Sequence, residues 1–400
     1  MHSNDGIVRM MRFCFAVLIG VLLAEPCLAQ STSPPPAAGS VRALLAGVRS
    51  WGYQLQKPDA EEIARSPYDL VVIDYSKTGE DEEAFSADDI QRMQVKPDGS
   101  RRIVLAYLSV GEAESYRYYW NHDWAEPLRV IAEGEIAEDT DEAKEKRSAA
   151  AKDAKATTPA RRAYPGVKLR TLHVPRLSAP VWLGRENDTW VGNFLVRYWE
   201  KSWQEIIFGS KTAYLDRIMA AGFDGVFLDR VDAFTGVADE RATGKAEMVQ
   251  FVTSLSTYAR KLKSDFVIMP QNGEDLLTDP SYLGAVDAIA KEDLLYGHPN
   301  EGQANPPPGI TMSLDRLAIA TAAGKPVFVV EYLLVRDTAE KIRAELAGKR
   351  MIPYFGVRSL DRLVLPDDLR SGTAPGAKLQ SGKRAAPVRK VRASNRNPKR

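Results

Sequence analysis

The sequence contains very little cysteine and histidine. Its 400 residues include two cysteines, Cys14 and Cys27, and both fall within the first 30 positions. If those positions form a cleaved leader, the remaining chain has no thiol, which excludes disulfide bonds, cysteine nucleophiles and cysteine-ligated zinc. None of the four histidines shows metal-ligand spacing, such as i, i+4 on a helix. We therefore expect neither a catalytic metal nor a cofactor.

Several sequence motifs of catalysis are also absent. No G-x-S-x-G occurs, which excludes the nucleophile elbow of a serine triad. No glycine-rich dinucleotide fingerprint or P-loop follows a candidate strand, which counts against a doubly wound open sheet, the main alternative fold. With 44% hydrophobic and 27% charged residues, the chain has the composition of a globular protein.

The first 30 residues have the pattern of a secretory leader. Arg9 and Arg12 precede the apolar run Phe13–Ala24, and small residues follow at the −3 and −1 positions of a cleavage site ending at Ala29. The run is shorter than the roughly 20 residues that span a bilayer. We expect residues 1–29 to be a signal peptide and the protein to be exported to a periplasm or beyond. An uncleaved anchor is the alternative.

Three further segments lack the pattern of a packed core. Residues 30–47 begin as a Ser/Pro/Ala linker, and about residues 133–163 form a surface insertion without an apolar stripe. Residues 371–400 carry nine Lys or Arg and no acid. The net charge of the whole chain, +1, therefore does not reveal that its C-terminal tail is basic. We expect this tail either to be solvated or to contact an anionic polymer or an envelope surface. We expect no specific nucleic-acid partner and a monomer.

Residues 48–370 alternate short apolar runs with helical patterns, as a parallel sheet covered by helices does. This alternation predicts a (β/α)8 TIM-type barrel. Nine runs compete for eight barrel positions, and we expect a terminal run to be the one outside. The runs are Ser50–Leu55, Leu70–Tyr75, Val104–Val110, Phe194–Trp199, Gly225–Val231, Val267–Asn272, Ala288–Leu294, Val327–Leu333 and Met351–Val357.

Helical patterns separate many of these runs. The predicted helices are Glu200–Ala221, Lys245–Lys263, Met312–Ala323 and Thr338–Ala347. Gly222, Gly324 and Gly348 stand where helix C-caps are expected.

Polar and aromatic residues cluster at the ends of the predicted strands. Active sites of parallel barrels form at the carboxyl ends of the strands, so these side chains are candidates for a common site. Each one alone has a structural explanation as a helix cap or an ion-pair partner. Aromatic rings suit the apolar faces of sugars. The predicted substrate-binding residues are Trp51, Tyr53, Asp74, Tyr107, Ser109, Glu112, Asp232, Asn272, Glu331 and Tyr354.

Strand alternation selects two carboxylates for catalysis. Glu292 shares a strand face with Ala288 and Ala290, whose small side chains leave it room to project into a pocket. Asp229 shares a face with Phe227. Glu331 shares a face with two valines, which leave less space, so we expect it to bind substrate. We predict that Asp229 and Glu292 are the catalytic pair.

Six motifs together resemble glycoside hydrolase family 114, and the similarity spans about residues 48–365. The most specific is G-F-D-G-V-F-L-D-R-V-D. The motifs lie at Trp51–Leu55, Ile73–Tyr75, Ala106–Glu112, Gly222–Asp232, Lys291–Asp293 and Pro326–Tyr332.

The resemblance implies a (β/α)8 barrel, endo-α-1,4-polygalactosaminidase-like activity and two catalytic acids, which match Asp229 as nucleophile and Glu292 as acid. Characterised members read D-P-D-N-V-D where this chain reads F-L-D-R-V-D, so Arg230 and Lys291 would add positive charge where an amino sugar is expected. The expected substrate is a polysaccharide that contains an amino sugar, galactosamine. The alternatives are an inactive carbohydrate-binding barrel and a hydrolase of another exopolysaccharide or envelope glycan.

Overall fold

The computed structural model describes residues 39–132, 169–238, 240–297 and 302–371. The predicted signal peptide, insertion and basic tail lie outside the described residues, apart from Ser371. The last part of the predicted linker is a helix, α1 (Val41–Leu45), which Ser40 caps through its side chain. Val41 and Leu45 are both buried because a spacing of four residues places them on one helix face.

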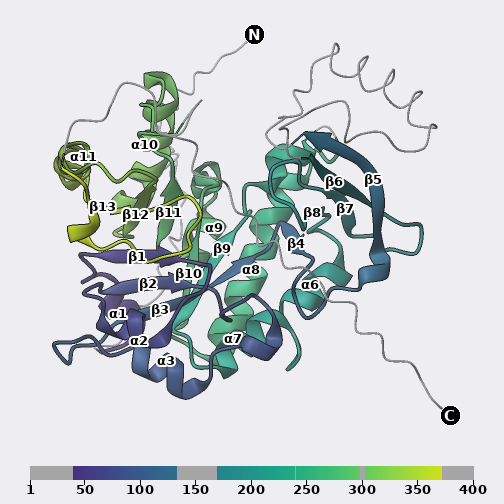
Figure 1. Cartoon of the computed structure of the whole chain (residues 1–400), viewed down its shortest axis with the longest axis horizontal. Helices are drawn as coiled ribbons and strands as arrows, with labels where there is room; N and C mark the ends of the chain where they lie inside the picture. The colour runs from purple at the N-terminus through teal and green to yellow at the C-terminus, as the bar shows by residue number, and fades with distance from the viewer. Residues whose placement is uncertain (1–38, 133–168, 239, 298–301, 372–400) are drawn as a thin grey trace, which may run out of the picture. The chain divides into compact units, whose positions relative to one another are not determined.

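Eight parallel strands form the barrel, in two hydrogen-bonded arcs (Figure 1). The first arc has the order β1, β2, β3, β9, β10, and the second has β11, β12, β13. The arcs meet at a parallel bridge between Gln271 and Ala290, and at a bond of 3.0 Å from Trp51 Nε1 to the carbonyl oxygen of Ile352. The strands are β1 (Trp51–Gln54), β2 (Leu70–Ile73), β3 (Ile103–Ser109), β9 (Gly225–Asp229), β10 (Val267–Pro270), β11 (Ile289–Glu292), β12 (Val327–Glu331) and β13 (Met351–Phe355).

The barrel strands are short and aliphatic because both of their faces are covered. Every residue of β2, β3, β10 and β12 is buried. A strand covered by side chains inside the barrel and by helices outside needs an unbroken apolar run, which is the pattern that the sequence shows.

Helices connect the strands and begin at side-chain caps in several cases. Asp59 caps α2, Ser86 forms a capping box with Asp89 at α3, and Asp279 caps α9. The helices are α2 (Ala60–Arg65), α3 (Ala87–Met93), α6 (Lys201–Ile207), α7 (Tyr214–Ala220), α8 (Gly244–Leu262), α9 (Pro280–Ala285), α10 (Pro307–Ala322) and α11 (Arg336–Gly348). Short 3-10 turns occur at Asp81–Glu83, His122–Trp124, Ala233–Val237, Glu274–Thr278 and Pro366–Asp368. No helix in the described part of the chain is long and apolar enough to cross a membrane.

Two predictions about helices are wrong in detail. The predicted helix Glu200–Ala221 is two helices, α6 and α7, and the break contains Gly209 with a φ of 110°. Gly348 is the last residue of α11 rather than its cap, and the left-handed conformation falls on Arg350, with a φ of 58°. Gly222 and Gly324 take the positive φ expected of C-caps.

The ninth predicted run lies outside the barrel, and it is an internal run rather than a terminal one. It forms β8 (Asn193–Val196), the middle strand of an antiparallel sheet with β4 (Glu112–Glu114) and β7 (Leu183–Glu186). Buried and partly exposed residues alternate along β8, as in a strand with one covered face. A second antiparallel pair, β5 (Ala125–Ala132) and β6 (Leu169–Pro175), flanks the predicted insertion.

Candidate active site

Two carboxylates occupy the last positions of their barrel strands. Asp229 ends β9, and Glu292 ends β11, with β10 between them. Both residues are partly buried, and the charge of Glu292 contributes to raising the pKa of Asp229. The predicted catalytic residues therefore lie within electrostatic reach of each other at the carboxyl ends of the strands.

Burial raises the pKa of Asp229 to about 7. The Arg230 charge and a hydrogen bond from Tyr107 act in the opposite direction, while Asp232 and Glu292 add to the increase. The Tyr107 hydroxyl donates to Asp229 Oδ2 at 2.8 Å. Tyr107 comes from β3, which pairs with β9 and brings Ser109 directly opposite Asp229.

Burial also raises the pKa of Glu292, against the effect of a hydrogen bond from Tyr332. The Tyr332 hydroxyl donates to Glu292 Oε1, and Gln271 Nε2 donates to Oε2 at 2.8 Å. Tyr53 extends this chain by donating to Gln271 Oε1 at 3.2 Å. Both oxygens of Glu292 are therefore fixed in direction, by Gln271 and by Tyr332.

The backbone turns sharply just beyond the strands that carry the site. Arg230, Asn272 and Asp293 have φ values of 61°, 59° and 52°, although none is glycine. Such left-handed positions cost free energy and occur often at active sites. Asn272 also accepts a hydrogen bond from the backbone N–H of Glu292, at 3.2 Å, so it fixes the main chain of the acid rather than its carboxylate.

The cations of the site are each paired with an acid. Arg230 lies 2.9 Å from Glu112, and Lys291 lies 3.2 Å from Glu274. The Glu112 carboxylate also accepts hydrogen bonds from the side chains of Asn187 and Asn193 in the antiparallel sheet. The positive charge that the sequence led us to expect at Arg230 and Lys291 is therefore compensated.

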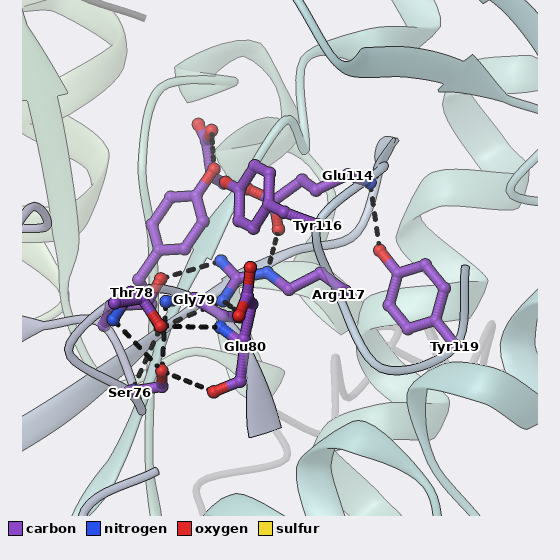
Figure 2. Close-up of polar contacts among 11 residues, drawn as sticks. Ser76, Thr78, Gly79, Glu80, Glu114, Tyr116, Arg117 and Tyr119 are labelled. Carbon is purple, nitrogen blue, oxygen red and sulfur yellow. Dashed lines mark hydrogen bonds and ion pairs between the residues drawn. The ribbon is translucent and has the colours of Figure 1, made fainter. Parts of the chain in front are cut away.

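A buried arginine stands behind Tyr107. Arg117 donates to both carboxylate oxygens of Asp74, at 2.9 and 2.8 Å, and to Glu114 Oε2 at 2.6 Å. Figure 2 shows Arg117 between Glu114 and Tyr116 on one side and the Ser76–Glu80 loop on the other. Tyr116 also donates its hydroxyl to Glu114. Because Arg117 occupies both of its oxygens, Asp74 has a structural partner where we predicted a contact with substrate.

The structure brings most of the predicted substrate-binding residues to this end of the barrel. Four of them form a hydrogen bond or an ion pair with another residue of the site: Tyr53, Tyr107, Glu112 and Asn272. Ser109 is 2% exposed, and its hydroxyl has no hydrogen-bond partner among the described residues. Asp232 is partly exposed and lies 3.5 Å from Arg230.

Trp51 and Tyr354 are placed differently from the prediction. Trp51 is 1% exposed and packs against Phe227 and Phe328 in the core. The Tyr354 hydroxyl accepts a hydrogen bond from the backbone N–H of Val364. Both rings line a cavity of about 670 Å³ whose other walls include residues that precede β1, β12 and β13 and none of the site carboxylates. Their aromatic character is explained by packing.

The predicted orientation of Glu331 is wrong. The register pairs Val330 with Glu292, so Val330 shares the face of Glu292 and Glu331 points to the other face. Glu331 is fully buried and accepts hydrogen bonds from the backbone N–H groups of Leu295 and Tyr296, at 2.8 and 3.1 Å. Burial raises its pKa to about 8. Its carboxylate anchors the loop after β11.

Sequence reasoning missed five residues of the site. Tyr332 and Gln271 each stand beside a predicted residue, and the alternation of β12 would have favoured Tyr332 had its register been known. Glu114 ends β4 of the antiparallel sheet, and Arg117 lies in the loop after it. The rule that sites form at the carboxyl ends of barrel strands does not apply there. The missed residues are Glu114, Arg117, Gln271, Tyr332 and Arg358. No group of His, Cys, Asp or Glu in the described part of the chain is arranged to hold a metal ion.

An eight-stranded parallel barrel with paired carboxylates at its strand ends has the architecture of a glycosidase. Comparison with known proteins agrees with this class. The chain belongs to glycoside-hydrolase family GH114, whose family model matches residues 173–368, and it is a glycoside hydrolase.

Relatives extend the similarity beyond the matched segment. An uncharacterized protein of Deinococcus radiodurans is 33% identical over 349 residues, which cover 83% of this chain and 90% of that protein. One of Methanocaldococcus jannaschii is 33% identical over 324 residues, covering 79% and 74%. The glycoside hydrolase domain of PelA from Pseudomonas aeruginosa is 16% identical with a TM-score of 0.48, covering 80% of this chain and 99% of that one.

Proposed function

We propose that this glycoside hydrolase is exported and cleaves a polysaccharide containing an amino sugar, with Asp229 and Glu292 as its catalytic pair. The observation that carries the proposal is the matched setting of the two carboxylates. Each ends a barrel strand, each has a pKa raised by burial, and each accepts a hydrogen bond from a tyrosine.

The chemistry needs one carboxylate protonated and the other ionised. Glu292 donates its proton to the glycosidic oxygen as the bond from that oxygen to the anomeric carbon breaks. Asp229 attacks the anomeric carbon, and water, deprotonated by Glu292, then releases the sugar from Asp229. This order of events gives Asp229 the ionised role and Glu292 the protonated role, as the family resemblance implies.

The charge of the site supports a cationic substrate. Arg230, Lys291 and Arg358 are each paired with an acid, at 2.9, 3.2 and 2.7 Å. Among the described residues, neither Asp229 nor Glu292 forms an ion pair, although the charges of Arg230, Lys291 and Arg358 act on them from nearby. With Glu292 protonated, the ionised Asp229 carboxylate favours the ammonium group of an unacetylated amino sugar and disfavours a uronic acid.

Export rests on the leader pattern of residues 1–29, and attachment to an anionic surface rests on the basic tail. A secreted enzyme that meets its polysaccharide outside the cell fits both features. The purified mature protein tests the substrate. Partially deacetylated galactosamine polymers should release oligosaccharides, whereas glucosamine polymers and uronic-acid polymers should not.

Two variants test the catalytic pair. Asp229→Asn and Glu292→Gln should each lose nearly all turnover while remaining folded, because each keeps the shape and removes a charge or a proton. Asp275→Asn is the matched control, since Asp275 is an acid of the same end of the barrel that pairs with Arg316 and is about half exposed. Near-normal turnover in either test variant would refute the pair.

A further inference from the structure

The two catalytic candidates are held by tyrosines from neighbouring strands. Tyr107 on β3 donates to Asp229, and Tyr332, which directly follows β12, donates to Glu292. Both tyrosines are nearly inaccessible, with exposures of 5% and 6%. Their hydroxyl groups are thus committed to the carboxylates rather than to solvent.

A guanidinium group stands against each of these tyrosine rings. Arg358 Cζ lies 4.3 Å from the centre of the Tyr332 ring, and Arg117 Cζ lies 5.9 Å from that of Tyr107. Arg117 also lies against the rings of Tyr116, Tyr214 and Tyr75, at 4.8, 5.3 and 5.5 Å, and of these four rings only Tyr107 donates to Asp229. Attraction between a cation and a ring extends to about 6 Å, so the contact at Tyr332 is the stronger of the two.

Acidic residues hold both arginines in place. Arg358 donates to Asp293 at 2.7 Å, and Arg117 donates to Asp74 and Glu114. The site therefore contains the same sequence of contacts twice: carboxylate, tyrosine, arginine, acid. The ion pairs described for the two arginines are with acids other than Asp229 and Glu292.

We propose that Tyr107 with Arg117, and Tyr332 with Arg358, are two positioning couples that fix a hydroxyl donor on Asp229 and on Glu292. In this view each arginine acts through its tyrosine, and each tyrosine acts on one carboxylate. The inference rests on the proposed function, because it takes these two carboxylates as the catalytic pair.

A hydroxyl that donates to a carboxylate stabilises the ionised form and lowers its pKa. Other charges facing Asp229 come from Arg230, Asp232 and Glu292, and none of them changes when Tyr107 loses its hydroxyl. Those facing Glu292 come from Lys291, Asp293 and Arg358, with Gln271 as a neutral donor. Removing either hydroxyl should therefore raise the pKa of its own carboxylate.

The test is the pH profile of kcat/KM for Tyr107→Phe and Tyr332→Phe in the whole protein. Asp229 must be ionised, so its pKa sets the acid limb, and Tyr107→Phe should move that limb upward by roughly one pH unit. Glu292 must be protonated, so Tyr332→Phe should move the basic limb upward by a similar amount. Tyr214→Phe is the control, because Tyr214 packs 5.3 Å from Arg117 and its hydroxyl has no partner among the described residues. Neither limb should move in the control.

A second arm tests the arginines. Arg358→Lys keeps the positive charge but loses the flat face that packs on Tyr332. It should lower kcat, and the double variant with Tyr332→Phe should be no slower than Tyr332→Phe alone. Arg117→Lys with Tyr107→Phe should behave in the same way but more weakly. Thermal melts identify any variant that fails to fold.

The outcomes separate this inference from the proposed function. A loss of kcat with unmoved limbs, or losses that add in the double variants, would overturn the couples while leaving the catalytic pair intact. If Tyr107→Phe moved the basic limb and Tyr332→Phe moved the acid limb, the couples would be supported and the roles of Asp229 and Glu292 would be reversed. Turnover that survives Asp229→Asn and Glu292→Gln would refute the proposed function itself.

Discussion

In the proposed mechanism, Asp229 contributes to function at the expense of stability. Its pKa is about 7 in the folded protein and near 3.8 in the unfolded chain, so the folded state binds more protons between these values. The stability that the neutral carboxyl provides is fully present below about pH 4 and is lost as the pH rises towards 7. Buried charges at active sites commonly have this effect.

We therefore predict that Asp229→Asn stabilises the protein at high pH. The gain should reach about 4 kcal/mol at pH 8, from about 1.4 kcal/mol for each unit of pKa difference, and should vanish below pH 4, since the amide never ionises. Thermal melts of the wild type and the variant across this range measure it. A variant equally or less stable than the wild type at pH 8 would show that the carboxylate is not penalised by burial.

Glu331 has a different role from the one that its strand end suggested. It accepts two backbone N–H groups from the loop after β11, and glutamine can accept only with its single oxygen. We predict that Glu331→Gln loses about 10- to 100-fold in rate, which corresponds to about 1.4–2.7 kcal/mol of transition-state stabilisation. Steady-state kinetics with a melting curve should show both the rate loss and a lower Tm. An unchanged Tm with the same rate loss would indicate a direct contact with substrate.

At the scale of elements, the loop after β3 approaches the turn after β9 very closely. A Cβ atom at Gly111 would lie 2.2 Å from the carbonyl oxygen of Arg230 and 2.6 Å from Ala233 Cβ. Only glycine permits this approach, which brings Glu112 into contact with Arg230. The glycine in the A-Y-L-S-V-G-E motif thus connects the antiparallel sheet to the turn beside Asp229.

We predict that Gly111→Ala separates these two turns. Overpacking of this kind costs about 1–3 kcal/mol of folding stability. Turnover should also fall, because Arg230, the neighbour of Asp229, is displaced. Gly236→Ala is the control, since a Cβ there would meet nothing within 4 Å. Wild-type activity in Gly111→Ala would show that the contact does not matter to the site.

The sequence predicted the elements better than their registers. Eight buried aliphatic runs became barrel strands because such runs suit a sheet covered on both faces. The register of β12 could not be predicted from the sequence. Side chains alternate with a period of two, so a shift by one residue places Tyr332 rather than Glu331 on the same face as Glu292. The break between α6 and α7 coincides with residues 209–212, Gly-Ser-Lys-Thr, which interrupt the apolar pattern and which the prediction of a single helix passed over.

At the scale of the whole molecule, the antiparallel sheet of β4, β8 and β7 supplies site contacts that the sequence did not show. Arg117, Glu114 and Asn193 belong to it or to the loop beside it, and they reach the site only through contacts between distant segments. Local pattern and strand-end rules do not describe such contacts. The strand-end positions of Asp229 and Glu292 were accessible to prediction, because each follows its own apolar run.

The basic tail allows a prediction at the same scale. Deleting residues 372–400 should leave the Tm unchanged, because a segment with so few apolar residues has little surface to bury. The deletion should weaken retention of the protein on an anionic polymer at low salt and not at high salt. A fall of several degrees in Tm would show that the tail packs against the enzyme.

The central claim is that Asp229 and Glu292 divide the chemistry, with Glu292 as the proton donor. The most direct measurement is the rate of Glu292→Gln on a glycoside with an activated leaving group, which departs without protonation. We predict that this substrate restores much of the cleavage step of Glu292→Gln and restores neither Asp229→Asn nor Glu331→Gln. Rescue of Glu331→Gln without rescue of Glu292→Gln would contradict the account and transfer the acid role to Glu331.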